Sequence, residues 1–198
     1  MISKNIWNNK NLVKILENNG VVVMPTDTIY GIAGKAEDES VVSRIYAIRK
    51  RNPDKPCIIL IGDIVELEKF SVVLSEAQRE KLKEHWPISA IADIGHNRAV
   101  SIVLDCNNDR FSYLHRGTNT LAFRAPTSQG LRDLLMKVGP LIAPSANTEA
   151  LPPSQNIAEA KKYFGNAIDL YVDGGSIAGK ASKVIKLHKD GSVVILRK

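Results

Sequence analysis

The chain has 198 residues, 44% of them hydrophobic, which is enough to bury a full core, and we expect a single domain over residues 1–198. No run approaches the roughly 20 apolar residues that a membrane span needs, and no apolar signal segment opens the chain. We therefore expect a cytoplasmic protein without a membrane partner. Its 27 Lys and Arg against 21 Asp and Glu give a formal charge of +6, which favours an anionic partner such as a nucleotide or RNA.

The cysteines and histidines do not follow a metal-binding pattern. Cys57 lies in an apolar run and Cys106 lies beside a polar segment, without CxxC spacing, as is typical of reduced thiols. The four histidines are scattered, with neither i, i+4 pairs nor cysteine partners. We therefore predict that the protein has no structural metal.

Hydrophobic periodicity predicts helices and strands in alternation. Apolar residues at helical spacing predict helices near residues 12–16, 41–51, 75–84, 128–138 and 156–164. Short apolar runs predict strands at residues 21–24, 58–61, 88–94, 100–104, 120–123, 141–143, 170–172, 183–187 and 193–196, the last two as a hairpin around Asp190-Gly191. Residues 106–118 are polar and are predicted to be irregular. This succession indicates the α/β class.

The loop motif PTDTIYG, Pro25 to Gly31, follows the first predicted strand. Pro25 is expected to end that strand because it has no N–H for the ladder, and Gly31 is expected to let the backbone turn. Thr26, Asp27, Thr28 and Tyr30 then present three hydroxyls and a carboxylate at the mouth of the sheet, where α/β proteins bind small polar ligands. An ordinary turn is the alternative interpretation, because Thr and Asp also bond their own backbone.

A basic cluster follows at the end of the second predicted helix. That helix is expected to end in Arg49-Lys50-Arg51, before Pro53, and Lys55 continues the positive charge into the next loop. Cations at a helix C-terminus also offset the helix dipole, which is a purely structural explanation for one of them. Four clustered cations are better suited to phosphate oxygens.

A second strand end repeats the arrangement of the first. The short strand at residues 141–143 runs into Pro144-Ser145-Ala146-Asn147. Ser145 and Asn147 are therefore expected to face the same crevice as Thr26. The segment lacks the G-x-S-x-G pattern of a nucleophile elbow, which argues against a serine hydrolase.

These motifs, in this order, resemble the YrdC family of threonylcarbamoyl-AMP synthases. The resemblance runs from Val21 to Val184 and includes PTDTIYG, the basic helix end, Thr120-Leu-Ala-Phe-Arg124, Ser145-Ala-Asn147 and Val172-Asp-Gly-Gly175. It implies a YrdC-like twisted mixed sheet, both parallel and antiparallel, flanked by helices and with a concave basic face. In that family L-threonine, bicarbonate and ATP give threonylcarbamoyl-adenylate and pyrophosphate. A downstream transferase complex then moves the activated group onto an adenosine beside the tRNA anticodon.

The resemblance also implies roles for single residues. The residues implied for catalysis are Arg49, Arg51, Ser145 and Asn147. The same four bind the ATP phosphates together with Lys55 and Ser182, with Mg²⁺ as the companion of ATP. The residues implied for L-threonine and bicarbonate are Thr26, Thr28, Tyr30, Thr120 and Arg124, of which Arg124 suits the threonine carboxylate.

Several positions depart from the family pattern. Arg49 stands where the family has lysine, and a guanidinium is broader than an ammonium group. The other departures are Ile88, Ser89 and Ile91 after Trp86-Pro87, Glu149-Ala150 for Ser-Gly, and Lys183 and Lys186 for a Thr and an Asp. A second hypothesis is therefore a catalytically weak paralogue that binds a nucleotide, tRNA or double-stranded RNA.

Overall fold

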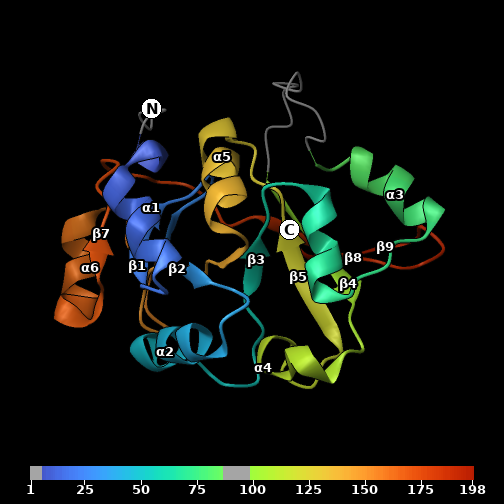
Figure 1. Cartoon of the computed structure of the whole chain (residues 1–198), viewed down its shortest axis with the longest axis horizontal. Helices are drawn as coiled ribbons and strands as arrows, with labels where there is room; N and C mark the ends of the chain where they lie inside the picture. Colours follow the sequence, from blue (N-terminus) through green and yellow to red (C-terminus); the bar gives the residue numbers. More distant parts are fainter. Residues whose placement is uncertain (1–5, 87–98) are drawn as a thin grey trace.

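The computed structural model describes residues 6–86 and 99–198, and within them one mixed nine-stranded sheet has the order β7-β1-β2-β6-β3-β5-β4-β8-β9 (Figure 1). The strands are β1 (Val22–Pro25), β2 (Tyr30–Lys35), β3 (Ile58–Leu60), β4 (Val100–Asp105), β5 (Thr120–Arg124), β6 (Leu141–Ile142), β7 (Leu170–Tyr171), β8 (Lys183–Leu187) and β9 (Val193–Arg197). The sheet contains both parallel pairs, such as β3 with β5, and antiparallel pairs, such as β4 with β5. The predicted mixed α/β sheet is confirmed, and the strand predicted at residues 88–94 lies outside the described residues.

The helices begin and end close to the predicted positions. The α-helices are α1 (Lys10–Glu17), α2 (Glu39–Arg49), α3 (Glu76–Lys83), α4 (Ser112–His115), α5 (Gln129–Val138) and α6 (Ile157–Phe164). Ser75 caps α3 through a capping box with Gln78, as its position before the apolar pattern indicated. The short 3-10 helices are η1 (Ile6–Asn8), η2 (Ile64–Phe70), η3 (Asp109–Phe111) and η4 (Gly165–Ala167). The expectation of an irregular stretch at residues 106–118 was wrong where η3 and α4 form.

The PTDTIYG motif is the turn of an antiparallel hairpin between β1 and β2. β1 ends at Pro25, as predicted, and Pro25 pairs in register with Tyr30. The expectation that Gly31 serves the turn was wrong, because Gly31 lies inside β2 opposite Met24. A side chain there would crowd Thr26 Cγ2, at 3.2 Å from an added Cβ, so glycine lets the hairpin pack closely.

Alternating residues of the strands separate two cores on the two faces of the sheet. In β1, Val23 belongs to the core that α2, α4 and α6 cover, whereas Val22 and Met24 belong to the core that α1 and α5 cover. Figure 1 shows α1 beside α5 on one side of the sheet and α2 with α4 on the other. Because helices cover both faces at this end of the sheet, its strands are apolar on both sides.

The face under α1 and α5 stays uncovered farther along the sheet. In β5, Leu121 and Phe123 are buried in the core on the opposite face, whereas Thr120, Ala122 and Arg124 line a cavity. The same alternation continues into β8, where Ile185 faces the core and Val184 the cavity. An open half of one sheet face therefore forms the floor of a site, which gives the predicted concave surface a physical origin.

Helix α2 ends earlier than its sequence pattern indicated. The prediction extended it through Arg51, but it ends at Arg49 because Lys50 adopts a left-handed conformation, with φ of 50°. In this conformation Lys50 N–H donates to the carbonyls of Ala47 and Tyr46, and Arg51 N–H donates to Tyr46 O at 3.0 Å. The chain thus reverses between the two arginines, and their side chains leave in different directions.

We expect the left-handed Lys50 to tolerate glycine but not a β-branched residue. Lys50→Gly should raise the free energy of unfolding by about 0.5 kcal/mol, because glycine adopts this conformation without steric cost. Lys50→Val should lower it by about 1–2 kcal/mol, since a branched side chain is strained there. Urea unfolding measures both values, and equal stability of the two variants would contradict the structure.

Candidate functional site

A cavity of about 550 Å³ lies over the open half of the sheet. Its polar lining includes most of the residues that the motifs singled out, although they come from segments far apart in the chain. The predicted residues in the lining are Thr26, Thr28, Arg51, Thr120, Arg124, Ser145 and Ser182. Hydroxyl groups and guanidinium groups converge here, so the cavity can bind an anionic small molecule.

The PTDTIYG turn forms one wall of this cavity, and its side chains form hydrogen bonds within the turn itself. Thr26 Oγ1 donates to Ile29 O at 2.7 Å, and it lies 2.9 Å from Thr28 Oγ1. The side chains therefore do bond their own turn, as the ordinary-turn interpretation proposed, yet both threonines also line the cavity. The local bonds hold the hydroxyls in place.

A buried ion pair links this turn to the end of β5. Arg124 Nη2 lies 2.9 Å from Asp27 Oδ1, and the two side chains are only 5% and 2% exposed. Arg124 Nη2 also donates to Thr26 Oγ1 at 3.4 Å, and Asp27 Oδ2 accepts from Thr127 N at 3.2 Å. The carboxylate of Asp27 was expected at the mouth of the sheet, but its pairing with Arg124 was not predicted. It neutralises and orients the arginine that was predicted to bind a carboxylate.

Arg51 enters the cavity along the loop that follows α2. Its Nε donates to Lys55 O at 3.1 Å and its Nη2 donates to Pro56 O at 2.9 Å. The guanidinium also lies 5.8 Å from the centre of the Tyr46 ring. Burial is the main cause that raises the pKa of Tyr46 to about 12, so this phenol stays neutral at physiological pH.

The segment Ser145–Asn147 reaches the cavity through its serine. Ser145 lines the cavity, whereas Asn147 and Arg49 are buried behind it and are not part of the lining. Arg49 donates to Ser145 Oγ and to Asn147 Oδ1, both at 3.3 Å. The structure therefore brings all three residues together, with only Ser145 exposed to a ligand.

The far wall of the cavity contains a residue that the sequence did not reveal. Arg197, near the end of β9, donates to Ser182 O through Nε at 3.1 Å and through Nη2 at 2.8 Å. Ser182 Oγ in turn lies 2.8 Å from Ser101 Oγ. Burial, followed by the charge of Arg124, lowers the pKa of Arg197. No motif marks Arg197, because it reaches the cavity only through the pairing of β9 with β8.

Besides Arg49 and Asn147, two more predicted residues, Lys55 and Tyr30, lie outside the cavity lining. Lys55 forms an ion pair with Glu149 at 2.7 Å, and its side chain is 60% exposed. Tyr30 is fully buried, and its hydroxyl donates to Gly175 O at 2.8 Å and accepts from Gly174 N at 2.9 Å. Tyr30 thus fastens the irregular segment at residues 173–182 to the hairpin.

That segment packs closely against the PTDTIYG turn. An added Cβ at Gly179 would overlap the carbonyl oxygen of Thr28, so glycine is required for this approach. Ala181 and Ser182, a few residues on, line the cavity. The segment therefore determines where the Ser182 side of the cavity lies relative to Thr28.

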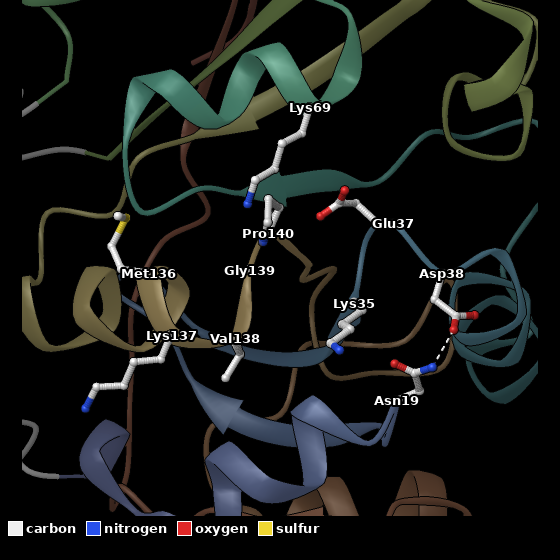
Figure 2. Close-up of a pocket in the computed structure, with 10 residues that line it drawn as sticks. All are labelled: Asn19, Lys35, Glu37, Asp38, Lys69, Met136, Lys137, Val138, Gly139 and Pro140. Atoms are coloured by element: carbon white, nitrogen blue, oxygen red, sulfur yellow. Dashed lines mark hydrogen bonds between the residues drawn. The ribbon is translucent and has the colours of Figure 1, made fainter.

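A second pocket, of about 490 Å³, lies near the end of α5 (Figure 2). None of the predicted site residues lines it. Its lysines, Lys35, Lys69 and Lys137, each donate to a neighbouring group at 2.9–3.2 Å. Figure 2 shows Asn19 bonded to Asp38, at 2.6 Å, in the same pocket. With its three lysines and Asp38 already partnered, this pocket is a weaker candidate than the cavity over the sheet.

In residues 6–86 and 99–198 no three His, Cys, Asp or Glu side chains gather as a metal site would require. No helix within these residues has the length and apolarity needed to cross a bilayer.

The fold and the cavity define an α/β protein with a small-molecule site that is lined by arginines and lies on an open sheet face. The family model for Sua5, YciO and YrdC, described as telomere recombination, matches residues 14–198. The chain therefore belongs to the Sua5/YciO/YrdC family.

Similar proteins agree with this assignment. The chain is 32% identical over 171 residues to the threonylcarbamoyl-AMP synthase of Chromohalobacter salexigens, and the match covers 85% of each chain. It is 28% identical over 185 residues to a putative threonylcarbamoyl-AMP synthase of Mycobacterium leprae, with 93% of this chain and 80% of that protein covered. These relatives have the activity in their names.

Solved structures share the fold. Sua5 of P. abyssi, complexed with L-threonine, is 26% identical with a TM-score of 0.78, and the match covers 100% of this chain and 55% of that one. YciO of E. coli, at 23% identity, has a TM-score of 0.78 over 99% of this chain and 90% of that one, which shows the fold alone. The chain thus spans about half the length of P. abyssi Sua5, as it does of the Bacillus subtilis synthase, where it covers 51%.

We expect Asp27→Asn to be strongly destabilising. The substitution leaves the buried Arg124 without its counter-charge, which costs about 3–5 kcal/mol in such pairs. The free energy of unfolding in urea measures the loss. The control Glu80→Gln removes an exposed ion pair with Lys83 and should change stability little. Equal effects of the two substitutions would show that the Asp27 pair is not energetically important.

We expect Gly179→Ala to impair the cavity more than the fold. The added methyl group must displace the Thr28 carbonyl or the segment at residues 173–182, so ligand affinity should fall about tenfold or more. Lys180→Ala, at an exposed neighbouring position, is the matched control. Threonine and nucleotide affinities of both variants, measured by calorimetry, test the expectation, which fails if Gly179→Ala binds as wild type does.

Proposed function

We propose that the protein is a threonylcarbamoyl-AMP synthase of the nucleotidyltransferase type. It would form threonylcarbamoyl-adenylate and pyrophosphate from L-threonine, bicarbonate and ATP, for the modification of adenosine beside the tRNA anticodon. Family membership and the names of the relatives support the proposal. The observation that carries it is the convergence of Arg51, Arg124 and Arg197 on one cavity.

The reaction requires two anions to be held together. The carbamate of threonine attacks the α-phosphorus of ATP while pyrophosphate leaves, so positioning and electrostatic stabilisation supply most of the catalysis. Arg51 lies at one side of the cavity, beside Pro56, and Arg124 lies at another, at the end of β5. Cations on separate walls suit two separate anionic groups.

In this proposal Arg51 and Ser145 bind the ATP phosphates, with Lys55 at the entrance. Lys55 must exchange its ion pair with Glu149 for a phosphate, which is feasible because the pair is largely exposed. Ser182, held by Arg197, completes the nucleotide side. A magnesium ion accompanying ATP would be held chiefly by phosphate oxygens and water, because the described residues offer no carboxylate cluster for it.

Threonine and bicarbonate are proposed to bind beside the PTDTIYG turn. Thr26, Thr28 and Thr120 offer hydroxyls to the amino acid and the carbamate, and Arg124 offers a guanidinium to the carboxylate. Asp27 holds that guanidinium by Nη2 and keeps it from turning away. Tyr30 contributes by fixing the segment at residues 173–182.

The test is pyrophosphate release from ATP with and without L-threonine, in the presence of bicarbonate and magnesium. Wild type should release pyrophosphate only with threonine, and Arg51→Ala should lose about 100-fold or more in kcat/KM because a phosphate-binding cation is removed. Arg79→Ala, which removes an exposed arginine of α3, is the matched control and should retain activity.

A different outcome would identify the alternative function. If wild type releases no threonine-dependent pyrophosphate but binds double-stranded RNA with an affinity that falls steeply with salt, the protein is a binding module and the synthase proposal fails. In that case Arg51→Ala should weaken RNA binding only slightly, since one phosphate contact among several is lost.

A further inference from the structure

Arg49 is buried behind the wall of the cavity that Ser145 forms. It is 2% exposed and lies behind Ser145 rather than in the cavity lining. Its Nε donates to Asn147 O at 3.0 Å, and its Nη2 donates to Ser145 Oγ and Asn147 Oδ1 at 3.3 Å. Its own carbonyl accepts from Glu149 N at 2.9 Å. Side chain and backbone of Arg49 therefore hold the segment at residues 145–149 at both of its ends.

Asn147 completes this internal brace. Its Nδ2 donates to Thr148 O at 2.8 Å and to Leu151 O at 2.7 Å, while its Oδ1 accepts from Arg49. Asn147 is 5% exposed and, like Arg49, is absent from the cavity lining. Of Ser145 and Asn147, only Ser145 lines the cavity.

The left-handed Lys50 separates the tasks of the two flanking arginines. It reverses the chain after α2, so that Arg51 enters the cavity while Arg49 remains under the segment at residues 145–149. In a continued helix, Arg49 and Arg51 would point about 200° apart around the helix axis. Arg51 would then not follow the loop that carries it into the cavity. The left-handed conformation of Lys50 thus leaves Arg51 free to bind a ligand, while Arg49 supports the segment at residues 145–149.

Stability alone does not explain a buried arginine at this position. Burial, with the charge of Arg51 as the next cause, lowers the pKa of Arg49, so keeping it charged costs free energy. Its Nη1 is buried and has no hydrogen-bond partner in the described residues. An apolar side chain of similar length would avoid both costs. Unlike an apolar side chain, however, the guanidinium donates directed hydrogen bonds to Ser145 and Asn147.

We propose that Arg49 is a positioning residue, which fixes Ser145 for the nucleotide through a brace with Asn147 and does not itself contact the phosphates. This inference rests on the proposed synthase function. It differs from the role expected from the sequence, in which Arg49 neutralises the triphosphate. A positioning role predicts that turnover suffers more than ATP affinity, because Arg51 and Lys55 still bind the phosphates when Ser145 is misplaced.

The kinetic test compares Arg49→Met with the cavity variant Arg51→Met. Arg49→Met should lower kcat about 100-fold, because a misplaced Ser145 no longer supports the reaction, and should leave KM for ATP within about threefold of wild type. Its thermal midpoint should not fall, because the buried charge is removed. Arg51→Met should instead raise KM for ATP about tenfold or more. A raised KM for ATP with unchanged kcat in Arg49→Met would overturn the proposal.

A double variant tests whether Arg49 and Asn147 act as one unit. If they share the brace, Arg49→Met/Asn147→Ala should be no more than about threefold slower than the slower single variant. Losses that multiply would mean that Arg49 acts independently of Asn147, and the proposal would fail.

Hydrogen exchange separates this inference from the synthase proposal. In Arg49→Met, amides of residues 145–149 should exchange about tenfold faster or more than in wild type, whether or not the protein has synthase activity. Unchanged exchange would refute the brace even in an active enzyme. If wild type is inactive but Arg49→Met still exchanges faster, the synthase proposal fails and the proposed brace is retained.

Discussion

The incomplete covering of one sheet face is the constraint on which the site depends. Helices α1 and α5 cover this face only over the strands at the β7 end, because Leu131, Leu135 and their neighbours pack against Val22, Met24 and Leu60. Beyond β3 the alternation of the strands continues, and no helix among residues 6–86 and 99–198 lines the cavity. A half-covered face can bind a ligand without opening the core, since the other face of β4, β5 and β8 remains packed.

Polar residues reach this open face without being left unpaired. Thr26 bonds its own turn, Arg124 is paired with Asp27, and Ser182 is bonded to Ser101 and Arg197. Thr26, Arg124 and Ser182 thus each have a partner that fixes the direction of the side chain. The resulting wall is preorganised, which favours transition-state stabilisation over flexible binding.

Much of the fold follows from local patterns. Helix positions, the helix start at Ser75 and the β8–β9 hairpin were predicted because periodicity and capping are local properties. The strand β2 was not predicted, because it contains two glycines, which are uncommon in strands. These glycines are explained only by the close packing of Thr26 and α2 against β2. The early end of α2 was also missed, because nothing in the residue type of Lys50 announces a left-handed conformation.

The sequence by itself determined the family, the α/β class and the cluster of threonines, arginines and Ser145 that form the candidate site, because these are encoded in contiguous motifs. Only the tertiary structure decided which of them face the ligand. Arg49 and Arg51 are two residues apart, yet one is buried and one lines the cavity. Arg197 reaches the cavity because β9 pairs with β8. Asp27 forms an ion pair with Arg124, which lies 97 residues farther along the chain. Such contacts depend on chain topology, which no short motif records.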